Sequence, residues 1–557
     1  MPADAAQIVN RFQRLVTRRA QFDTLVDEVA EFVLPHRGQI QRRELGAQVP
    51  GEKQTTRLFD ATGAEANRLL AASMQGSLTS SAVPWFHLKT RQEAINKIKR
   101  VQDWLEDTEG RMYLAFRQSN FYAETVETYL DLGAFGTGCM YIGEREPEGD
   151  REFGGFLFRS HPFGAYVLGE GPDGMVDTLM RQQVMTTRAC VIQWTLAKVG
   201  ERIRALYAKN PDEEVTILHA VYPRKDRDEG QYDNQNMPWS SCYLDLEGKH
   251  LIDEGGFHDF AYVVPRWEKT AGEEYGRGPG MLALPDIRTL NKADEMVLDA
   301  AGMAIRPPTT SVTDAILGEI DLTPGGHTYL EQAGALQFLD TKARFDVSHV
   351  LTEDRRARVQ RIFFWEQLQL QQGKVMTATE VERRWDTMRR VLGPTLGRLE
   401  SEFLNRIIDR CFAIMLRRGA FLPPPPELNG ADLDIEYEGP LARSQKSSRL
   451  SALEQAGMLL QPMMAMSPEF ARKVEENLEE DEMIRDVWQT AGAPSQWLKS
   501  AEARDAARAQ RQEQERMQQQ VNMAEQVATA AGKGAPMLKA VQDGAAQMQA
   551  QPQEVPA

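Results

Sequence analysis

The chain has 557 residues, of which 42% are hydrophobic and 26% charged, and its formal net charge is −16. This length exceeds what one hydrophobic core serves, so we expect several domains, and the acidic balance disfavours a protein that reads DNA sequence through a basic face. The apolar runs are too short to span a bilayer and no secretory signal is visible, so we predict no membrane segment and synthesis in the cytoplasm.

The first quarter of the chain predicts helices. Residues 8–34 place apolar side chains at steps of three, four or seven, which is typical of an amphipathic helix. A second helix is expected to start at Asp60 or Thr62, and a third helical stretch over 101–138 is expected in two pieces.

The next block changes to strands. From about residue 139 to residue 270, strand-length apolar runs alternate with Gly, Pro and Asp turn signals, and "LEGK" is a predicted hairpin turn. The four cysteines lie far apart, so we expect small buried side chains rather than a zinc site or a disulfide framework.

Residues 286–306 predict a helix with a small apolar face that permits close packing, and Pro307-Pro308 end it. The residues that share this face are Leu290, Val297, Ala301 and Ala304. A turn-rich insertion follows, and then a second helix of similar length over 352–372 with Thr352 as its cap. The arginines of this second helix could bind phosphate or pair with acids of neighbouring chains; they are Arg355, Arg356, Arg358 and Arg361.

The stretch "LQLQQGKVMTATEVERR" predicts a short tip between two helices. Gly373 is a natural helix end, and the capping box from Thr377 to Glu380 starts the next helix. We expect that helix to be kinked at Gly393-Pro394 and to carry an apolar stripe from Leu396 to Ile414. A proline-rich linker, a lone strand in "LDIEYEG", short helices over 450–500 and an Ala/Gln-rich tail complete the chain.

The sequence lacks the common catalytic motifs. A Gly-Lys pair is never followed by Ser or Thr as in a P-loop, and neither H-E-x-x-H nor G-x-S-x-G occurs. We therefore predict no catalytic residues, no cofactor and no metal. Asp432, Asp434 and Glu436 share one face of the expected strand, which leaves a metal-dependent nuclease as an alternative.

Several stretches, in one order and with matching spacing, resemble the portal, or head-to-tail connector, proteins of short-tailed bacteriophages. These stretches are "FDATGAEANRLLAASMQGSLTSSAVPWFHL", "VPRWEKTAGEEYGRGPGMLALPDIRTLNKADEM", "VMTATEVERR", the "LGP" break and "LPPPPELNGADLDIEYEGPLARSQK". The resemblance runs from the first helix to about residue 450. It implies an α+β, predominantly helical portal fold with an α/β wing, a helical stem, a small α/β clip and a helical crown.

The resemblance also implies boundaries for these parts. The expected parts are a wing (1–284), stem helices (285–306 and 351–372), a clip (307–350), a tunnel loop (373–378), a long kinked helix that returns to the wing with a Pro-rich linker and a strand (379–440), a crown (441–500) and a tail that extends a helical barrel or is disordered (501–557).

The function implied by the resemblance is structural. It is a ring, expected to be a dodecamer, at one capsid vertex, through which the genome is packaged and later ejected. The expected partners are further copies of the chain, double-stranded DNA, the terminase packaging ATPase, and capsid, scaffolding and tail adaptor proteins, in a virion assembled in the host cytoplasm. The candidate DNA-facing residues are Gln372, Gly373, Lys374, Val375 and Met376. A packaging enzyme or another ring-shaped head–tail adaptor is the alternative.

Overall fold

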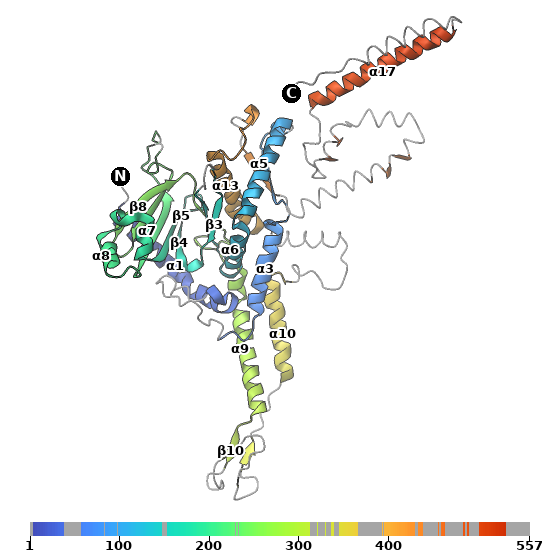
Figure 1. Ribbon diagram of the computed structural model, residues 1–557. Coiled ribbons are helices and arrows are strands. Elements are labelled where there is room, and N and C mark those ends of the chain that lie inside the picture. The colour runs from blue at the N-terminus through green and yellow to red at the C-terminus, as the bar shows by residue number, and fades with distance from the viewer. Residues whose placement is uncertain are drawn as a thin grey trace. The chain divides into compact units, whose positions relative to one another are not determined.

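The computed structural model describes residues 4–37, 57–82, 84–96, 98–146, 153–228, 230–231, 233–311, 345–365, 395–428, 433–437 and 501–530, with isolated positions and short pieces elsewhere. The chain forms two compact units, one from residues 1–91 and 105–445 and the other from residues 92–104 and 446–557. The first unit combines helices with several antiparallel sheets (Figure 1). In the second, α17 (Ala501–Ala530) is one long helix, and most of its described side chains are exposed.

The N-terminal helices begin close to where the sequence predicts them. Asp4 accepts a hydrogen bond from the Ala6 backbone N–H (3.0 Å) at the start of the first helix, and Asp60 accepts one from the Thr62 N–H (2.9 Å) at the start of the next. The long stretch after residue 98 is broken at Ser119-Asn120, as predicted. The helices of this region are α1 (Ala5–Val33), η1 (Pro35–Arg37), α3 (Thr62–Leu78), α4 (Glu93–Asn96), α5 (Lys99–Gln118) and α6 (Phe121–Phe135).

A five-stranded antiparallel sheet forms the largest β element, which confirms the predicted β-rich block. Its strands follow the order β4 (Tyr166–Glu170), β5 (Val176–Thr186), β6 (Glu214–Pro223), β7 (Trp239–Asp245) and β8 (His250–Phe257). The "LEGK" turn joins β7 to β8, and its Lys249 has a φ of 48°.

Alternation along the strands gives this sheet two apolar faces. On one face α1 packs through Ile8, Phe12 and Leu15, next to Leu218 of β6. On the other face, Val215 of β6 lies in a second cluster with the helices α7 (Thr187–Lys198) and α8 (Glu201–Lys209). Both faces are therefore covered within the chain (Figure 1).

Two smaller sheets complete the body of the first unit. One has the order β3-β2-β9, formed by Phe156–Ser160, Met140–Glu144 and Tyr262–Val263, with η2 (Phe163–Ala165) after β3. The other pairs β1 (Phe86–Thr90) with β12 (Leu433–Tyr437) in antiparallel register. The strand in "LDIEYEG" is therefore not alone, contrary to expectation, because residues about 350 positions earlier in the chain supply its ladder partner.

The cysteines match the expectation of small buried side chains. Cys139, Cys190, Cys242 and Cys411 are all buried thiols. Trp85 and Trp267 are also buried, and Trp85 packs among the rings of Phe86, Phe116 and Phe121.

Two long helices and a short ladder lie in the part of the chain for which a stem and a clip are expected. They are α9 (Pro279–Ile305), β10 (Thr309–Ser311), β11 (Leu336–Phe338) and α10 (Phe345–Ile362), and β10 pairs with β11 in antiparallel register. However, α9 begins at Pro279 rather than at 285, and α10 begins at Phe345, inside the expected clip. Thr352 lies inside α10 rather than at its start, so its predicted role as the cap is wrong. The helix begins seven residues earlier, at Phe345.

The returning helix carries the predicted apolar stripe. A π-helical turn, η4 (Glu400–Leu404), leads into α13 (Asn405–Arg417), and η5 (Pro426–Leu428) follows. Leu399, Phe403, Ile407, Cys411 and Ile414 are all buried. In the part of the chain that the structure describes, no helix combines the length and hydropathy needed to cross a bilayer.

Candidate functional site

The start of α9 is fixed by a crossing of glycines. The "YGRGPG" loop runs against Gly136, which ends α6 with a φ of 73°. A Cβ added to Gly278 would lie 2.6 Å from the Gly136 nitrogen, and one added to Gly276 would lie 2.2 Å from the Gly136 oxygen. Only glycine permits this approach. Pro279 then occupies the first helical turn, where its missing N–H has no cost.

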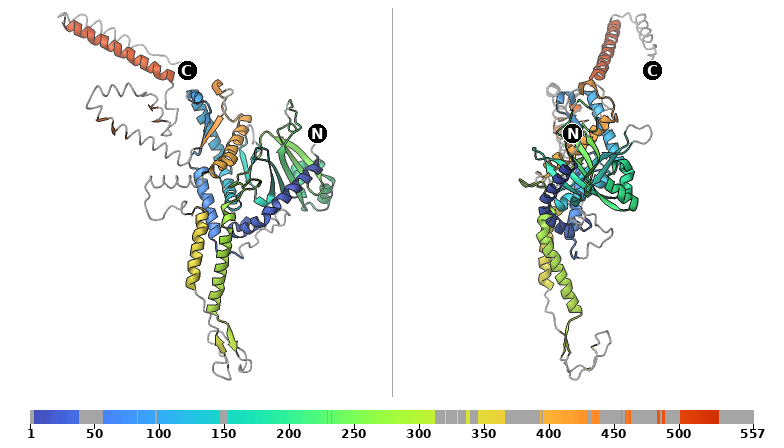
Figure 2. Two further views of the ribbon diagram at one scale, coloured as in Figure 1. Left: turned by 180° about the vertical axis from the view of Figure 1, so that it is seen from behind. Right: turned by 90° about the vertical axis from the view of Figure 1, so that its left-hand side faces the viewer.

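Helices α9 and α10 lie side by side, as both views show (Figures 1 and 2). With 27 residues, α9 is about 40 Å long. Three arginines of α10, Arg355, Arg356 and Arg358, bind acids of the same chain. Arg355 forms an ion pair with Asp286 on α9, and the Arg358 Nε lies 3.8 Å from the same carboxylate. The sequence left two partners open for these arginines, phosphate and acids of neighbouring chains. The structure instead pairs Arg355 and Arg358 with an acid of the same chain.

Arg356 joins three segments at the root of the helix pair. Its guanidinium donates to Asp60, just before α3 (3.0 Å), and to Asp294 on α9 (2.7 Å). Burial raises the pKa of the Asp294 carboxyl, with the neighbouring Asp60 charge adding to the rise, while the Arg356 charge opposes it. Asn291 also ties α9 to the segment before α3, because its side-chain oxygen accepts from the Phe59 and Asp60 backbone N–H groups (2.7 and 3.1 Å).

The four predicted packing residues of α9 have different exposures. Leu290 is buried, Val297 and Ala301 are half-buried, and Ala304 is exposed near the end of the helix. Residues 290, 297 and 301 lie within about 40° of one another on a helix that advances about 100° per residue. Asp294, which pairs with Arg356 of α10, lies close to the same face. The predicted DNA-facing residues Gln372, Gly373, Lys374, Val375 and Met376 lie outside the described residues.

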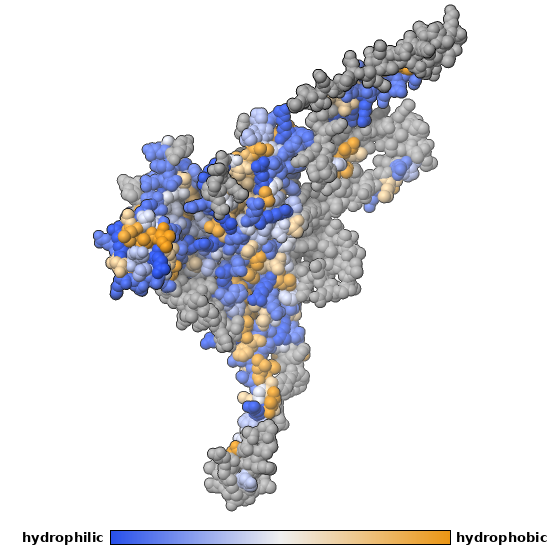
Figure 3. Space-filling model, viewed as in Figure 1, coloured by the Kyte–Doolittle hydropathy of each residue, from blue (hydrophilic) through white to orange (hydrophobic). Residues whose placement is uncertain are grey.

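The lower half of α9 exposes large apolar side chains on two flanks. Met296 and Met303, seven residues apart, are 61% and 52% exposed, and Leu298 and Ile305, also seven apart, are 59% and 79% exposed. At about 100° per residue, the first pair lies roughly 200° from the second. We call them the methionine flank and the leucine flank. Figure 3 shows apolar surface along this helix.

A buried ion cluster holds the returning helix on the body. Arg266, which follows β9, is 1% exposed. Its guanidinium donates to both Glu402 oxygens, from Nε to Oε2 (3.0 Å) and from Nη2 to Oε1 (2.6 Å), and its backbone N–H donates to Oε2 (3.1 Å). Glu170 at the end of β4 is a second partner. Burial opposes the charged form, but the bonds and charges of Glu402 and Glu170 outweigh it, so the pKa of Arg266 is raised.

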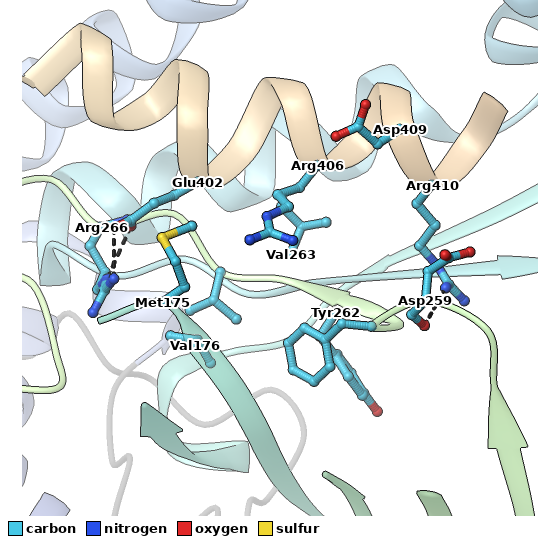
Figure 4. Close-up of a pocket in the computed structure, with 12 residues that line it drawn as sticks. Met175, Val176, Asp259, Tyr262, Val263, Arg266, Glu402, Arg406, Asp409 and Arg410 are labelled. Carbon is cyan, nitrogen blue, oxygen red and sulfur yellow. Dashed lines mark hydrogen bonds and ion pairs between the residues drawn. The ribbon is translucent and has the colours of Figure 1, made fainter. Parts of the chain in front are cut away.

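This cluster closes one end of a small cavity of about 140 Å³ between α13 and the connector after β9 (Figure 4). At the other end, Arg410 donates to the backbone oxygens of Ile142 (3.0 Å) and Asp259 (2.7 Å). Among the described residues, no group of three or more His, Cys, Asp or Glu side chains could hold a metal ion.

The sequence reasoning missed Arg266 and Glu402. Their signal was weak but present: Glu402 directly precedes Phe403 on an apolar stripe, and Arg266 follows the apolar run "AYVVP". A charged residue at the edge of a buried run is seldom left without a partner. The partner itself lies 136 residues away, and no local pattern identifies it.

Comparison with known proteins identifies the family of this chain. Residues 5–498 match the family model described as "Bacteriophage head to tail connecting protein". The chain belongs to this family. It is 30% identical over 478 residues to the "Probable portal protein" of Bordetella phage BPP-1, covering 84% of each chain, and 29% identical over 483 residues to the "Portal protein" of Salmonella phage epsilon15, covering 84% of this chain and 85% of the other.

Among solved structures, a chain titled "Neck of empty GTA particle computed with C6 symmetry" covers 73% of this chain and 90% of its own, at 12% identity and a TM-score of 0.34. The match of residues 5–498 to the family model confirms the resemblance to connector proteins seen in the sequence. The expected α+β, mainly helical class agrees with the described elements. The relatives that define the family here are portal proteins, so the nuclease alternative is not favoured.

Proposed function

We propose that copies of this chain form the ring-shaped DNA channel at one vertex of a bacteriophage head, through which the genome enters and later leaves, and which joins head to tail. The match of residues 5–498 to the connector family carries this proposal. The protein would act through its shape and surface charge, without a catalytic step.

The two flanks of α9 support a ring. A helix that exposes apolar side chains on opposite sides is only half covered by one neighbour, so each copy needs a neighbour on both sides. When two different faces meet, the contact is heterologous, and such contacts generate a closed ring if the rotation closes. The ring would place the methionine flank of one copy against the leucine flank of the next. We propose twelve copies, as the resemblance to short-tailed phage portals implies.

In this ring, α9 and α10 form the stem, residues 307–350 the clip, and Gln372 to Met376 the part of each copy that faces DNA. Each copy would contribute one Lys374 to a ring of positive charge, while the net charge of −16 per chain limits the total attraction to phosphate. The duplex would pass without being held tightly.

The proposed partners follow from this position. The packaging ATPase and later the tail adaptor proteins would meet the ring outside the head, and capsid and scaffolding proteins would surround it in a particle assembled in the host cytoplasm. The finished ring would stay in the virion.

The mass of the purified protein under native conditions tests the ring, and two variants test its contact. Met296→Glu damages the methionine flank and Leu298→Glu the leucine flank. Each variant alone should stay unassembled, because every junction needs one intact flank of each kind. A mixture of the two should form pairs and nothing larger, since only one intact junction is available.

Met296→Leu keeps the apolar surface and is the matched control, expected to assemble like the wild type. Dimers of Met296→Glu alone would show that like flanks pair, which contradicts the heterologous contact. A wild-type protein that remains a single chain at every concentration and salt tested would overturn the ring itself.

A further inference from the structure

Phe364 lies two residues after the end of α10, and Glu402 lies in the π-helical turn that precedes α13. The segment between these points includes the residues that we propose to face DNA. Its two ends contact adjacent residues of the segment that follows β9, which we call the connector segment: Phe364 contacts Trp267, and Glu402 binds Arg266. This shared anchor is not a consequence of chain order, because the two ends are 38 positions apart and the connector segment lies about 100 positions upstream.

The outgoing end has an unusual backbone. Phe364 has a φ of 58°, which is a rare conformation for a bulky aromatic residue. Its ring centroid lies 6.5 Å from that of Trp267, within the range of aromatic pairs. Phe363 beside it is fully buried. Backbone strain of this kind persists only where the surroundings fix it, so the contacts of Phe363 and Phe364 have to oppose its relaxation.

The return end is also irregular. Glu402 lies in the π-helical turn Glu400–Leu404, and such turns change the direction in which the following side chains point. Here Glu402 meets the Arg266 guanidinium in a two-point contact with both carboxylate oxygens, and it also accepts the Arg266 backbone N–H. Charge-assisted bonds of this geometry fix position as well as contributing energy.

The segment with Arg266 and Trp267 is also hydrogen-bonded to the body. The Trp267 backbone N–H donates to the Gly136 oxygen (2.9 Å), at the glycine crossing that starts α9. Arg266 Nη2 also donates to the Gly174 oxygen (3.0 Å). The connector segment is thus bonded to the end of α6 and to the turn between β4 and β5, both within the body.

We propose that Arg266 and Trp267 act as one clamp that sets the positions of both ends of the proposed channel segment and couples them mechanically. Arg266 and Trp267 are positioning residues in this view, and neither needs to touch DNA. A displacement of the helix that includes Glu402 would move Arg266 through its ion pair. Because Trp267 is the next residue, it would move too and would shift Phe364 at the end of α10 through the ring contact. The inference rests on the proposed function only for the statement that the clamped segment faces the channel.

Hydrogen–deuterium exchange on the unassembled full-length chain tests the coupling. Glu402→Gln keeps the shape of the side chain but removes its charge. We expect exchange to rise by about tenfold in residues 395–410, because bonds to a charged group are lost. The decisive result is a rise of several-fold at the last turn of α10 as well, with which Glu402 forms no hydrogen bond or ion pair among the described residues. Asp409→Asn on the same helix is the matched control and should leave α10 unchanged.

Phe364→Gly provides a second, independent variant. Glycine accepts the positive φ without strain, so the backbone can keep its course while the ring contact with Trp267 is lost. We expect faster exchange in residues 395–410. If each substitution accelerates exchange only at its own end, the clamp is overturned, whether or not rings form. Ring formation is measured separately by native mass, so failure of the clamp and failure of the ring are distinguishable.

Discussion

The five-stranded sheet and the proposed stem helices, α9 and α10, use apolar residues in opposite ways. In the sheet, strand residues such as Leu218 and Val215 face two clusters that α1, α7 and α8 cover, so its apolar surface is buried within one chain. On α9, Met296, Leu298 and Ile305 are more than half exposed. The sheet is complete as a monomer, whereas the stem exposes the kind of surface that marks protein contacts.

The polar side chains of the two regions also differ in how completely they are buried. In the sheet, the buried His219 has two hydrogen-bond partners, the Tyr262 hydroxyl (2.8 Å) and the Ser241 hydroxyl (3.0 Å). At the root of the stem, Arg356 binds Asp60 and Asp294 while 31% of its side chain remains accessible to solvent. The sheet therefore needs no further partner for its apolar surface, whereas in the proposed ring the surface of the stem would be covered by other copies.

The largest effect on stability should come from the core of the sheet. Leu218→Ala leaves a cavity at a fully buried position, and we expect the free energy of unfolding to fall by about 2–5 kcal/mol. Leu298→Ala removes the same atoms from an exposed stem position and should change it by less than about 0.5 kcal/mol. Urea unfolding of the unassembled chain measures both. Similar losses for the two variants would show that the stem flank is buried in the monomer.

The sequence predicted the parts of this contrast that depend on local pattern. The 3.6-residue period gave α1 and the stripe from Leu399 to Ile414, and alternation with turn residues gave the sheet. Contacts between segments that are distant in the sequence could not be predicted from such local patterns. The pairing of β12 with β1 and the bond between Arg266 and Glu402 join residues far apart in sequence, and they need a fold before they can be found.

The candidate site was predicted in part. The helix pair was expected, but α9 begins at Pro279 because the glycine crossing at Gly136 allows the helix to start there, and no periodicity reports such a crossing. Likewise, the exposed flanks of α9 include Met296 and Leu298, which a search for buried faces passes over. The predicted small face with Leu290 and Val297 described only the side that packs within the chain.

The pH dependence of stability should also separate the regions. Burial, and then the charge of Arg181, lower the pKa of His219 from 6.5 to about 3. Below pH 6.5 the imidazole of His219 binds a proton in the unfolded chain but stays neutral in the folded sheet. The free energy of unfolding therefore falls as the pH falls from about 6.5 toward about 3. One such site contributes up to about 1.4 kcal/mol per pH unit. His219→Gln should flatten this acid dependence in thermal unfolding, and an unchanged slope would contradict the assignment.

Asp294 at the root of the stem should behave with the opposite sign. Burial raises its pKa in the folded chain, so protonation favours folding at acidic pH and this contribution is lost as pH rises through the folded pKa. Arg356→Met removes the cation that opposes the shift. We expect a loss of about 1 kcal/mol near neutral pH. The loss should shrink on acidification, and chemical unfolding at a series of pH values measures it. A loss that stays constant or grows in acid would show that pairing with carboxylates is not the main role of Arg356.

The smallest effect on the folded chain should come from the flank itself, and this is where the contrast is sharpest. Met303→Ser removes an apolar side chain that is 52% exposed, so the unassembled protein should unfold within about 0.5 kcal/mol of the wild type. Assembly should nevertheless weaken, because the same side chain would be buried against the next copy in the proposed ring. Sedimentation over a range of concentrations measures the second quantity. A variant that unfolds and assembles like the wild type would place the contact between copies elsewhere. A side chain that is buried only in the ring affects assembly and leaves the stability of the single chain unchanged, so assembly is the measurement that decides.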